Sequence, residues 1–350
     1  MNPMDSKVYR NTLENVCCDG MNGKTVLITG ATGMIGSCLI DALAVWNSKN
    51  TEPCHIVALS RSEASAKKRF SYCWEEPWFR YIQQDVCSAP NNWPEKADYV
   101  IHAASNADPR SFAKAPVDTL LANVIGTENL LKHGTQHGMK RFLYVSSGEM
   151  YGQPDAQQHD FVEDYCGPVD HSAARACYPA GKRAAEVLCQ SYISQYGADA
   201  VIVRPCHIFG PTMTGSDSRA ASEFLRNAAR GENIGMKSAG LVERSHCYVI
   251  DAANAIFKVL LQGECGNAYN IADPVLQMTI RDFAKLAAEA GNSEVVFENP
   301  DDLELKGYSK VSRAVLSSEK LQKLGWQGQE KAETAICQTV QILREINGVK

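Results

Sequence analysis

The sequence predicts an α/β protein: a Rossmann-type, doubly wound parallel sheet with a smaller C-terminal α/β lobe. Three observations support this prediction. Short β-rich apolar runs alternate with helical patterns through much of the chain. A glycine-rich turn at 30–36 separates the first such run from the first long helical pattern. Beyond about residue 206 the alternation becomes shorter and irregular, which indicates a separate lobe.

The composition is that of a globular protein large enough for two lobes. The chain has 350 residues, 45% of them hydrophobic and 21% charged, with a net charge of −5. It has no basic tract and no apolar run of the ~20 residues that a membrane helix needs, so neither a nucleic-acid nor a membrane partner is expected. The thirteen cysteines are scattered and form no C-x-x-C pair. We therefore expect reduced thiols, a cytoplasmic location and no metal site.

The first strand and the turn after it form a dinucleotide-binding pattern. Residues 24–29 are a β-rich apolar run, and residues 37–46 have helical apolar spacing. The glycines between them let the backbone approach a pyrophosphate, and the helix N-terminus offers free N–H groups to this anion. The expected contacts to NAD or NADP are Gly30, Thr32, Gly33, Met34, Ile35 and Gly36.

Further cofactor contacts are expected where later strands end. Ser60 and Arg61 follow the strand at 55–59, where NAD enzymes normally carry an acid for the adenosine ribose. These residues would tolerate or attract the 2′-phosphate of NADP; alternatively, Arg61 only lies on an exposed loop. The contacts expected after the strands at 80–84 and 98–101 are Asp85, Val86, Ala103, Ala104 and Ser105. His102, beside them, is expected to be a hydrogen-bonded structural residue.

Two further strands and several helices follow. The helical pattern at 116–137 has a broad apolar face that includes Leu120, Leu121, Val124 and Ile125. A fifth strand, 140–145, ends in polar residues, at the sheet edge where α/β proteins place their chemistry. The remaining expected elements are a strand at 200–204, helices at 219–230, 251–262, 279–290 and 329–346, and short strands at 268–271 and 294–297.

The stretch from Cys177 to Arg183 opens another long helical pattern, which runs to about Gly197. Tyr178 and Lys182 are four residues apart and therefore lie on one helix face. Because an ammonium group favours a neighbouring phenolate, we expect the pKa of Tyr178 to fall from about 10 towards neutral pH. Tyr178 is then a candidate general acid or base, although an ordinary surface pair would have the same spacing.

These elements divide the chain into three expected segments. Residues 1–22 form an N-terminal leader that packs on the outside or is partly disordered. Residues 23–205 form the dinucleotide-binding Rossmann domain, to which residues 244–272 partly return. Residues 206–350 are mainly a substrate-binding lobe.

Several motifs resemble those of the extended short-chain dehydrogenases/reductases that act on nucleotide sugars, the NAD-dependent epimerase/dehydratase family. In chain order they are Thr29-Gly30-x-x-Gly33-x-x-Gly36, Asp85-Val86, His102-Ala103-Ala104, Asn123-Val124-x-Gly126-Thr127, Ser146-Ser147-x-x-x-Tyr151-Gly152, Tyr178-x-x-x-Lys182 and Tyr248-Val249-x-Asp251. The resemblance implies a catalytic set of Ser147, Tyr178 and Lys182. It also implies cofactor contacts by Asn123, Tyr178, Lys182 and Pro205.

The resemblance further implies a 4-keto sugar intermediate that an epimerase reduces, a 4,6-dehydratase dehydrates or a decarboxylase decarboxylates. Dehydratases carry two acids after the Ser/Thr, but here Gly148 and Glu149 occupy these places. UDP-glucuronate decarboxylases have the glutamate, and the segment from Arg175 to Glu186 resembles theirs. We therefore expect UDP-glucuronate-decarboxylase-like chemistry with Glu149 as a catalytic residue. A C4 epimerase, a 4,6-dehydratase and a non-catalytic NAD(P)-binding sensor are the alternatives.

Substrate contacts and assembly follow from the same resemblance. Ser147 would contact the sugar, Arg244 matches the arginine that grips the pyrophosphate, and Arg219 lies in a segment like the decarboxylases' Asp-Gly-Arg. His207, also expected at the substrate, stands where these families usually have Asn, and Thr212 stands where decarboxylases have Arg. The expected partners are a UDP-linked sugar and a second copy of the chain, paired through the two long helices.

Overall fold

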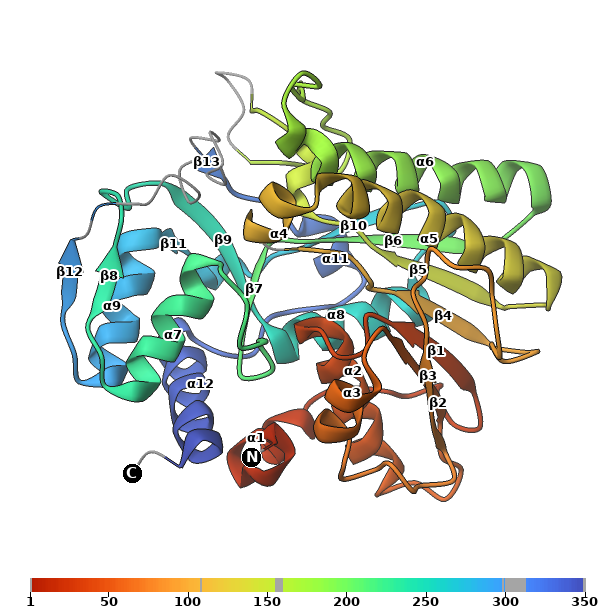
Figure 1. The fold of residues 1–350 in the computed structure, drawn as a ribbon, viewed down its shortest axis with the longest axis horizontal. Helices are drawn as coiled ribbons and strands as arrows, with labels where there is room; N and C mark the ends of the chain where they lie inside the picture. The colour runs from red at the N-terminus through yellow and green to blue at the C-terminus, as the bar shows by residue number, and fades with distance from the viewer. Residues whose placement is uncertain (1, 108, 155–159, 298, 300–312, 349–350) are drawn as a thin grey trace.

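A seven-stranded parallel sheet dominates the computed structural model, which describes residues 2–107, 109–154, 160–297, 299 and 313–348 (Figure 1). The strand order is β10-β6-β5-β4-β1-β2-β3. The strands are β1 (Thr25–Thr29), β2 (His55–Ser60), β3 (Phe79–Gln83), β4 (Tyr99–His102), β5 (Arg141–Val145), β6 (Ala200–Pro205) and β10 (Ala268–Ile271). The chain reverses its direction of winding between β1 and β4, so a binding crevice is expected at their carboxyl ends. The predicted Rossmann-type fold is confirmed.

Helices cover both faces of this sheet (Figure 1). One face carries α4 (Pro109–Lys114), α5 (Pro116–Gln136) and α6 (Cys177–Tyr196), and the other carries α2 (Met34–Asn47), α3 (Glu63–Arg69) and α8 (Val249–Gln262). All six residues of β6 are buried, as expected for a strand between two helical layers. This double burial is why the strands read as continuous apolar runs in the sequence.

The C-terminal lobe is built on smaller sheets. Strand β9 (Glu243–Tyr248) pairs with β7 (His207–Phe209), β11 (Gln277–Thr279) and β13 (Arg313–Ala314), and β8 (Ile234–Met236) pairs with β12 (Val295–Phe297). The helices of this part are α7 (Ala220–Arg230), α9 (Ile280–Gly291), α11 (Glu319–Lys323) and α12 (Ala332–Asn347). The predicted long helices are present, whereas β7, β8, β9, β11 and β13 were not predicted, because most of them are only two or three residues long.

A buried ion pair joins the sheet to helix α6. Arg204 on β6 donates from Nε and Nη2 to the two carboxylate oxygens of Glu186 on α6, at 3.0 and 2.7 Å. Its Nη1 donates to the hydroxyl oxygen of Tyr151 at 3.0 Å, and the Tyr151 hydroxyl donates to Asn270 on β10 at 2.6 Å. All four side chains are buried. Because each charge is paired and hydrogen-bonded, the network holds two strands and a helix in one arrangement.

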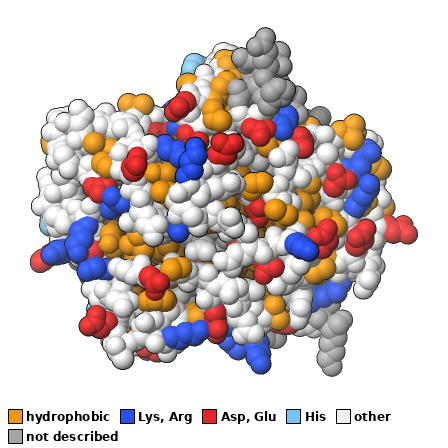
Figure 2. Space-filling model, turned by 180° about the vertical axis from the view of Figure 1, so that it is seen from behind, with side chains coloured by type: hydrophobic (Ala, Val, Ile, Leu, Met, Phe, Trp, Pro, Cys, Tyr) orange, Lys and Arg blue, Asp and Glu red, His pale blue; other side chains and the backbone are white. Residues whose placement is uncertain are grey.

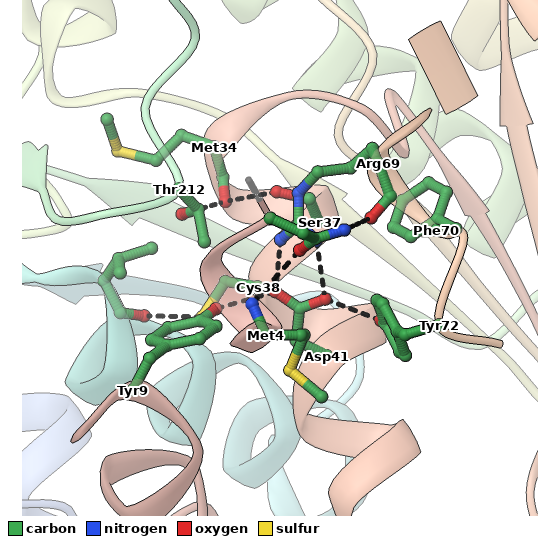
Figure 3. Close-up of polar contacts among 12 residues, drawn as sticks. Met4, Tyr9, Met34, Ser37, Cys38, Asp41, Arg69, Phe70, Tyr72 and Thr212 are labelled. Atoms are coloured by element: carbon green, nitrogen blue, oxygen red, sulfur yellow. Dashed lines mark hydrogen bonds and ion pairs between the residues drawn. The ribbon is translucent and has the colours of Figure 1, made fainter. Parts of the chain in front are cut away.

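The first residues of the chain also contribute to the core. The Asp41 carboxylate on α2, fully buried, accepts hydrogen bonds from the Tyr9 hydroxyl at 2.8 Å, the Tyr72 hydroxyl at 2.6 Å and Arg69 Nη1 at 3.0 Å (Figure 3). Tyr9 belongs to α1 (Lys7–Leu13) and is itself fully buried. Residues of the expected outer leader are therefore fastened to α2 by a buried polar cluster.

The remaining surface properties are ordinary. On the face shown in Figure 2, basic and acidic side chains are interspersed with apolar ones. No helix within the described ranges is long and apolar enough to cross a membrane. All thirteen cysteines are free thiols. Among the residues with described positions, no three or more His, Cys, Asp or Glu side chains are grouped as metal ligands.

Two carboxyl groups are buried near the start of α8 and the end of β10. Asp251, 2% exposed, accepts a hydrogen bond from the backbone N–H of Gln329 at 3.2 Å. Burial raises the pKa of Asp251 to about 7; the hydrogen bond from Gln329 opposes this shift, and the nearby charge of Asp273 adds to it. Burial also raises the pKa of Asp273. In the folded protein Asp251 therefore keeps a proton at pH values where the unfolded chain has released it.

The free energy of unfolding should consequently fall as the pH rises towards and through 7. The unfolded Asp251 ionises near pH 4, whereas the folded one ionises at about 7, so this group should remove about 3 kcal/mol of stability between pH 5 and pH 8. Denaturant titrations at several pH values measure the effect, and Asp251→Asn should lack it. The exposed Glu289→Gln is the matched control. Parallel pH profiles for wild type and Asp251→Asn would contradict the assignment.

Candidate active site

A cavity of about 770 Å³ opens where β1, β4, β5 and β6 end. It brings together most of the residues singled out from the sequence. Those that line it are Gly30, Gly33, Met34, Ile35, Gly36, Arg61, Ala103, Ser105, Ser147, Glu149, Tyr178, Lys182, Pro205, His207, Arg219 and Arg244. The cavity thus contains both the glycine turn and the predicted catalytic set.

The glycine turn is shaped by close backbone contacts. Gly30 has a φ of +65°, and a Cβ there would lie 2.6 Å from the carbonyl oxygen of Ala103. A Cβ at Gly36 would lie 2.4 Å from the carbonyl oxygen of Gly30. Helix α2 begins directly after Gly33, which gives it no side-chain cap, and its first turn lines the cavity. Free N–H groups at such a helix start fit the pyrophosphate of a dinucleotide.

Several predicted cofactor residues do not line the cavity; they are Thr32, Ser60, Asp85, Val86, Ala104 and Asn123. The Ser60 hydroxyl lies 3.2 Å from that of Tyr81, and Asp85 accepts from the backbone N–H of Cys87 at 2.9 Å. Arg61, by contrast, lines the cavity and lies 3.5 Å from Asn106 Oδ1. The cofactor contacts of the residues outside the cavity stay predictions.

His102 has the structural environment that the sequence predicted. It is fully buried, and its Nδ1 lies 2.7 Å from Thr29 Oγ1. Burial, reinforced by the charge of Lys182, lowers the pKa of His102 to about 3. The ring is therefore neutral and joins the ends of β4 and β1.

Lys182 is anchored beneath the Tyr178 ring. Its ammonium donates to the carbonyl oxygen of Val145 at 2.8 Å and lies 5.6 Å from the ring centre of Tyr178. Burial lowers the pKa of Lys182 to about 7. Burial raises the pKa of Tyr178 to about 12; the charge of Glu149 reinforces this shift, and a hydrogen bond with Ser147 opposes it. The expected fall in the Tyr178 pKa is wrong here, because desolvation outweighs a lysine that is itself readily discharged.

Glu149 lies on a turn at the edge of the cavity. Strand β5 ends at Val145, and Gly148–Tyr151 form a 3-10 turn. Ser147 caps this turn, accepting a hydrogen bond from the Glu149 backbone N–H at 3.2 Å. The Glu149 carboxylate accepts from Arg175 Nη2 at 2.9 Å. Glu149 therefore both pairs within the loops and lines the cavity.

Three side chains at the site were not selected from the sequence: Phe112, Arg175 and Asp217. The Phe112 ring on α4 stacks on Tyr178 with ring centres 4.5 Å apart, and the Arg175 guanidinium lies 5.4 Å from the centre of the same Phe112 ring. Asp217 accepts from Nε and Nη2 of Arg219, the latter at 2.6 Å. The three-residue spacing of Arg175 and Tyr178 could have indicated that Arg175 lies near the site, but no motif marks Phe112.

The predicted substrate residues include two arginines and a neutral histidine. Arg244 is 8% exposed, and burial lowers its pKa. Burial, with the charge of Arg244 next in importance, holds the pKa of His207 well below its ordinary value. His207 is therefore an uncharged hydrogen-bonding group, and Arg219 and Arg244 supply positive charge suited to phosphate groups.

A glycine turn at the sheet's reversal point and a Ser–Tyr–Lys set in one cavity define a dinucleotide-dependent enzyme of the dehydrogenase/reductase type. The chain belongs to the NAD dependent epimerase/dehydratase family, whose model matches residues 26–272. UDP-glucuronic acid decarboxylase 6 of Arabidopsis thaliana is 33% identical over 281 residues, which cover 79% of this chain and 78% of the relative. UDP-glucuronic acid decarboxylase 1 of Danio rerio is 32% identical over 323 residues, which cover 91% of this chain and 72% of the relative.

Solved structures show the same fold. A UDP-glucuronic acid 4-epimerase from Bacillus cereus, in complex with UDP-glucuronic acid and NAD, has a TM-score of 0.77 and 19% identity, over 92% of this chain and 99% of the epimerase. A dTDP-glucose 4,6-dehydratase from Streptomyces venezuelae has a TM-score of 0.77 and 22% identity, over 93% and 98%. The principal prediction from the sequence, an NAD-dependent enzyme of this family similar to UDP-glucuronate decarboxylases, is confirmed.

Replacing Tyr178 by phenylalanine should abolish most turnover while preserving the fold. Phenylalanine keeps the ring stacked on Phe112 but removes the hydroxyl that can carry a proton. We expect a fall in kcat of about 100-fold or more, the range of general acid–base catalysis, with unchanged cofactor affinity. Tyr192→Phe is the matched control, because its hydroxyl is on the same helix but contacts Glu128 instead of the cavity. A Tyr178→Phe enzyme within a few-fold of wild type would refute the role.

Proposed function

We propose that this chain decarboxylates a UDP-linked hexuronate, with UDP-glucuronate as the substrate. The observation that carries the proposal is Glu149, whose carboxylate lines the same cavity as Ser147, Tyr178 and Lys182. A C4 epimerase needs only the last three, and Gly148 replaces the first acid of the 4,6-dehydratases. The relatives named UDP-glucuronic acid decarboxylases support the same choice.

In this proposal Tyr178, Ser147 and Glu149 each have a separate task. Tyr178 accepts the proton of the sugar 4-hydroxyl, which Ser147 holds by a hydrogen bond. Because burial raises the pKa of Tyr178 to about 12, its phenolate would depend on the positive charge that bound NAD⁺ brings to the cavity. When bound, NAD accepts the hydride from C4 and later returns it. Between these events the C5–C6 bond breaks: its electron pair becomes the C4–C5 double bond of an enolate, and the carboxylate leaves as CO2. A proton then adds to C5, and in this proposal Glu149, which lines the cavity, donates that proton or directs the water that does.

The cofactor preference is proposed from Arg61. Its guanidinium lines the cavity, whereas the Ser60 hydroxyl is occupied by Tyr81. We propose that Arg61 lies beside the adenosine ribose and lets the enzyme accept NADP as well as NAD. Turnover should therefore be measured with each cofactor in turn.

The free thiols favour a reducing compartment, and we propose a cytoplasmic location on this basis.

Turnover of UDP-glucuronate to a UDP-pentose and CO2 tests the proposal directly. Glu149→Gln keeps a side-chain oxygen for Arg175 but cannot transfer a proton, so it should oxidise C4 and then stall. We expect product formation to fall by about 100-fold or more while the absorbance of reduced nicotinamide rises. Glu333→Gln, an exposed glutamate on α12, is the control. Product at the wild-type rate from Glu149→Gln would make Glu149 structural and favour a C4 epimerase.

We also propose that two copies of the chain pair through α5 and α6. These helices pack together, and α5 exposes apolar side chains: Val117 is 65%, Leu121 37% and Ile125 36% exposed. Burying this face on a second copy would form a four-helix bundle. Light scattering at micromolar concentration should give twice the 38.3 kDa chain mass, and Leu121→Glu should give the single-chain mass. A 38.3 kDa particle from the wild type would exclude the pairing.

A further inference from the structure

Phe112 joins the short helix α4 to the start of α6. Of the six residues of α4, all of them described, Phe112 alone is buried, and it is 2% exposed. Its ring stacks on that of Tyr178, with ring centres 4.5 Å apart and ring planes inclined by 21°. Phe112 is not among the residues that line the cavity. Any effect of this ring on the reaction must therefore pass through Tyr178 or another side chain of the site.

The phenol lies on a part of α6 that needs support from outside the helix. Tyr178 is the second residue of α6, and Ala176, which precedes the helix, gives no side-chain cap. The first N–H groups of an uncapped helix have no partner within it, and helix ends fray. Lys182, one turn further on, is anchored to the carbonyl oxygen of Val145. The stack on Phe112 restricts the plane of the Tyr178 ring, which a hydrogen bond at the phenol oxygen alone would leave free to turn.

The Phe112 ring also affects the ionisation of the phenol. An apolar ring in contact with a phenol disfavours the phenolate, because it excludes water and presents the negative face of its π system. Burial is the largest cause of the raised pKa of Tyr178, about 12. The charged and titratable groups that face this phenol are Lys182 on the same helix and, from other elements, Tyr144, Glu149, Arg175 and Arg219.

We propose that Phe112 is a positioning residue for Tyr178, which holds the phenol ring in the orientation for proton transfer and keeps water away from it. The inference rests on the role of proton carrier proposed above for Tyr178. Loss of the ring should slow the reaction, because the phenol loses its orientation. It should also make the phenol easier to ionise, because water reaches it. A residue that only supported the fold would not produce the second effect.

Titration of the phenol tests the second effect without any substrate. Protein carrying an NMR-active carbon isotope at the tyrosine Cζ atoms is titrated with NAD bound, and the Tyr178 signal is identified by its absence from Tyr178→Phe. In Phe112→Leu, which keeps an apolar side chain without a ring, we expect Tyr178 to ionise at a pH lower by about half a unit or more. Phe70→Leu is the matched control, because Phe70 is fully buried against another ring, that of Phe79, outside the cavity. Its Tyr178 titration should match that of the wild type.

Rapid mixing with UDP-glucuronate tests the first effect, by following the reduction of bound NAD instead of the final product. We expect Phe112→Leu to reduce NAD about 10-fold more slowly at the optimal pH, with the half-saturating substrate concentration within about 3-fold of wild type. The acid limb of the pH profile should move to lower pH together with the Tyr178 titration. If Phe112→Leu does not fold, Phe112→Met, which fills the space with a flexible chain, should show both effects in smaller degree.

An unchanged Tyr178 titration or an unchanged rate in Phe112→Leu would overturn the inference. So would weaker substrate binding at an unchanged rate, because it would assign Phe112 to substrate binding. The outcomes also separate the two proposals. A wild type that releases no CO2 from UDP-glucuronate would reject the decarboxylase function alone, since the titration needs no substrate. CO2 release by the wild type, with a wild-type titration and rate in Phe112→Leu, would reject the role of Phe112 alone.

Discussion

The bidentate ion pair between Arg204 and Glu186 is the constraint on which the arrangement of the active site depends. Removing a charge from water is unfavourable by several kcal/mol unless the charge is paired. The arrangement that keeps Arg204 and Glu186 paired is therefore strongly preferred over arrangements that separate them. That geometry fixes α6 against β6. Through Tyr151 it also fixes the 3-10 turn that carries Glu149, and through Asn270 it reaches the edge strand β10.

Helix α6 is consequently held at three positions within little more than one turn. Lys182 is bonded to β5, Glu186 to β6, and Arg183 donates to the carbonyl oxygens of Met150 and Gly167. The helix start, one turn before, carries Tyr178, the proposed proton carrier. Glu149 and Arg175 lie instead on the short turns on either side, where an ion pair joins them and the Arg175 guanidinium lies over Phe112. The proposed proton carrier and the charge pair near it are thus fixed by separate sets of contacts.

Much of this could be predicted from the sequence, for reasons that are local. The central strands are buried on both faces and so appear as apolar runs in the sequence. The glycines are required by close backbone contacts, of Gly36 with Gly30 and of Gly30 with Ala103 after the neighbouring strand. The environment of Tyr178 could not be predicted, because its desolvation depends on Phe112, which carries no motif. The pairing of Arg175 with Glu149 could not be predicted either, because Glu149 is 26 residues away on the 3-10 turn that follows β5.

The cluster around Asp41 sets the order in which parts of this protein can be completed during its synthesis. Tyr9 leaves the ribosome roughly sixty residues before Arg69 and Tyr72, a delay of about 3 to 12 s at typical translation rates. Until then Asp41 lacks the cation and the second phenol that stabilise it when buried. Helix α1 therefore cannot be fixed in the core by this cluster until the third strand is about to emerge.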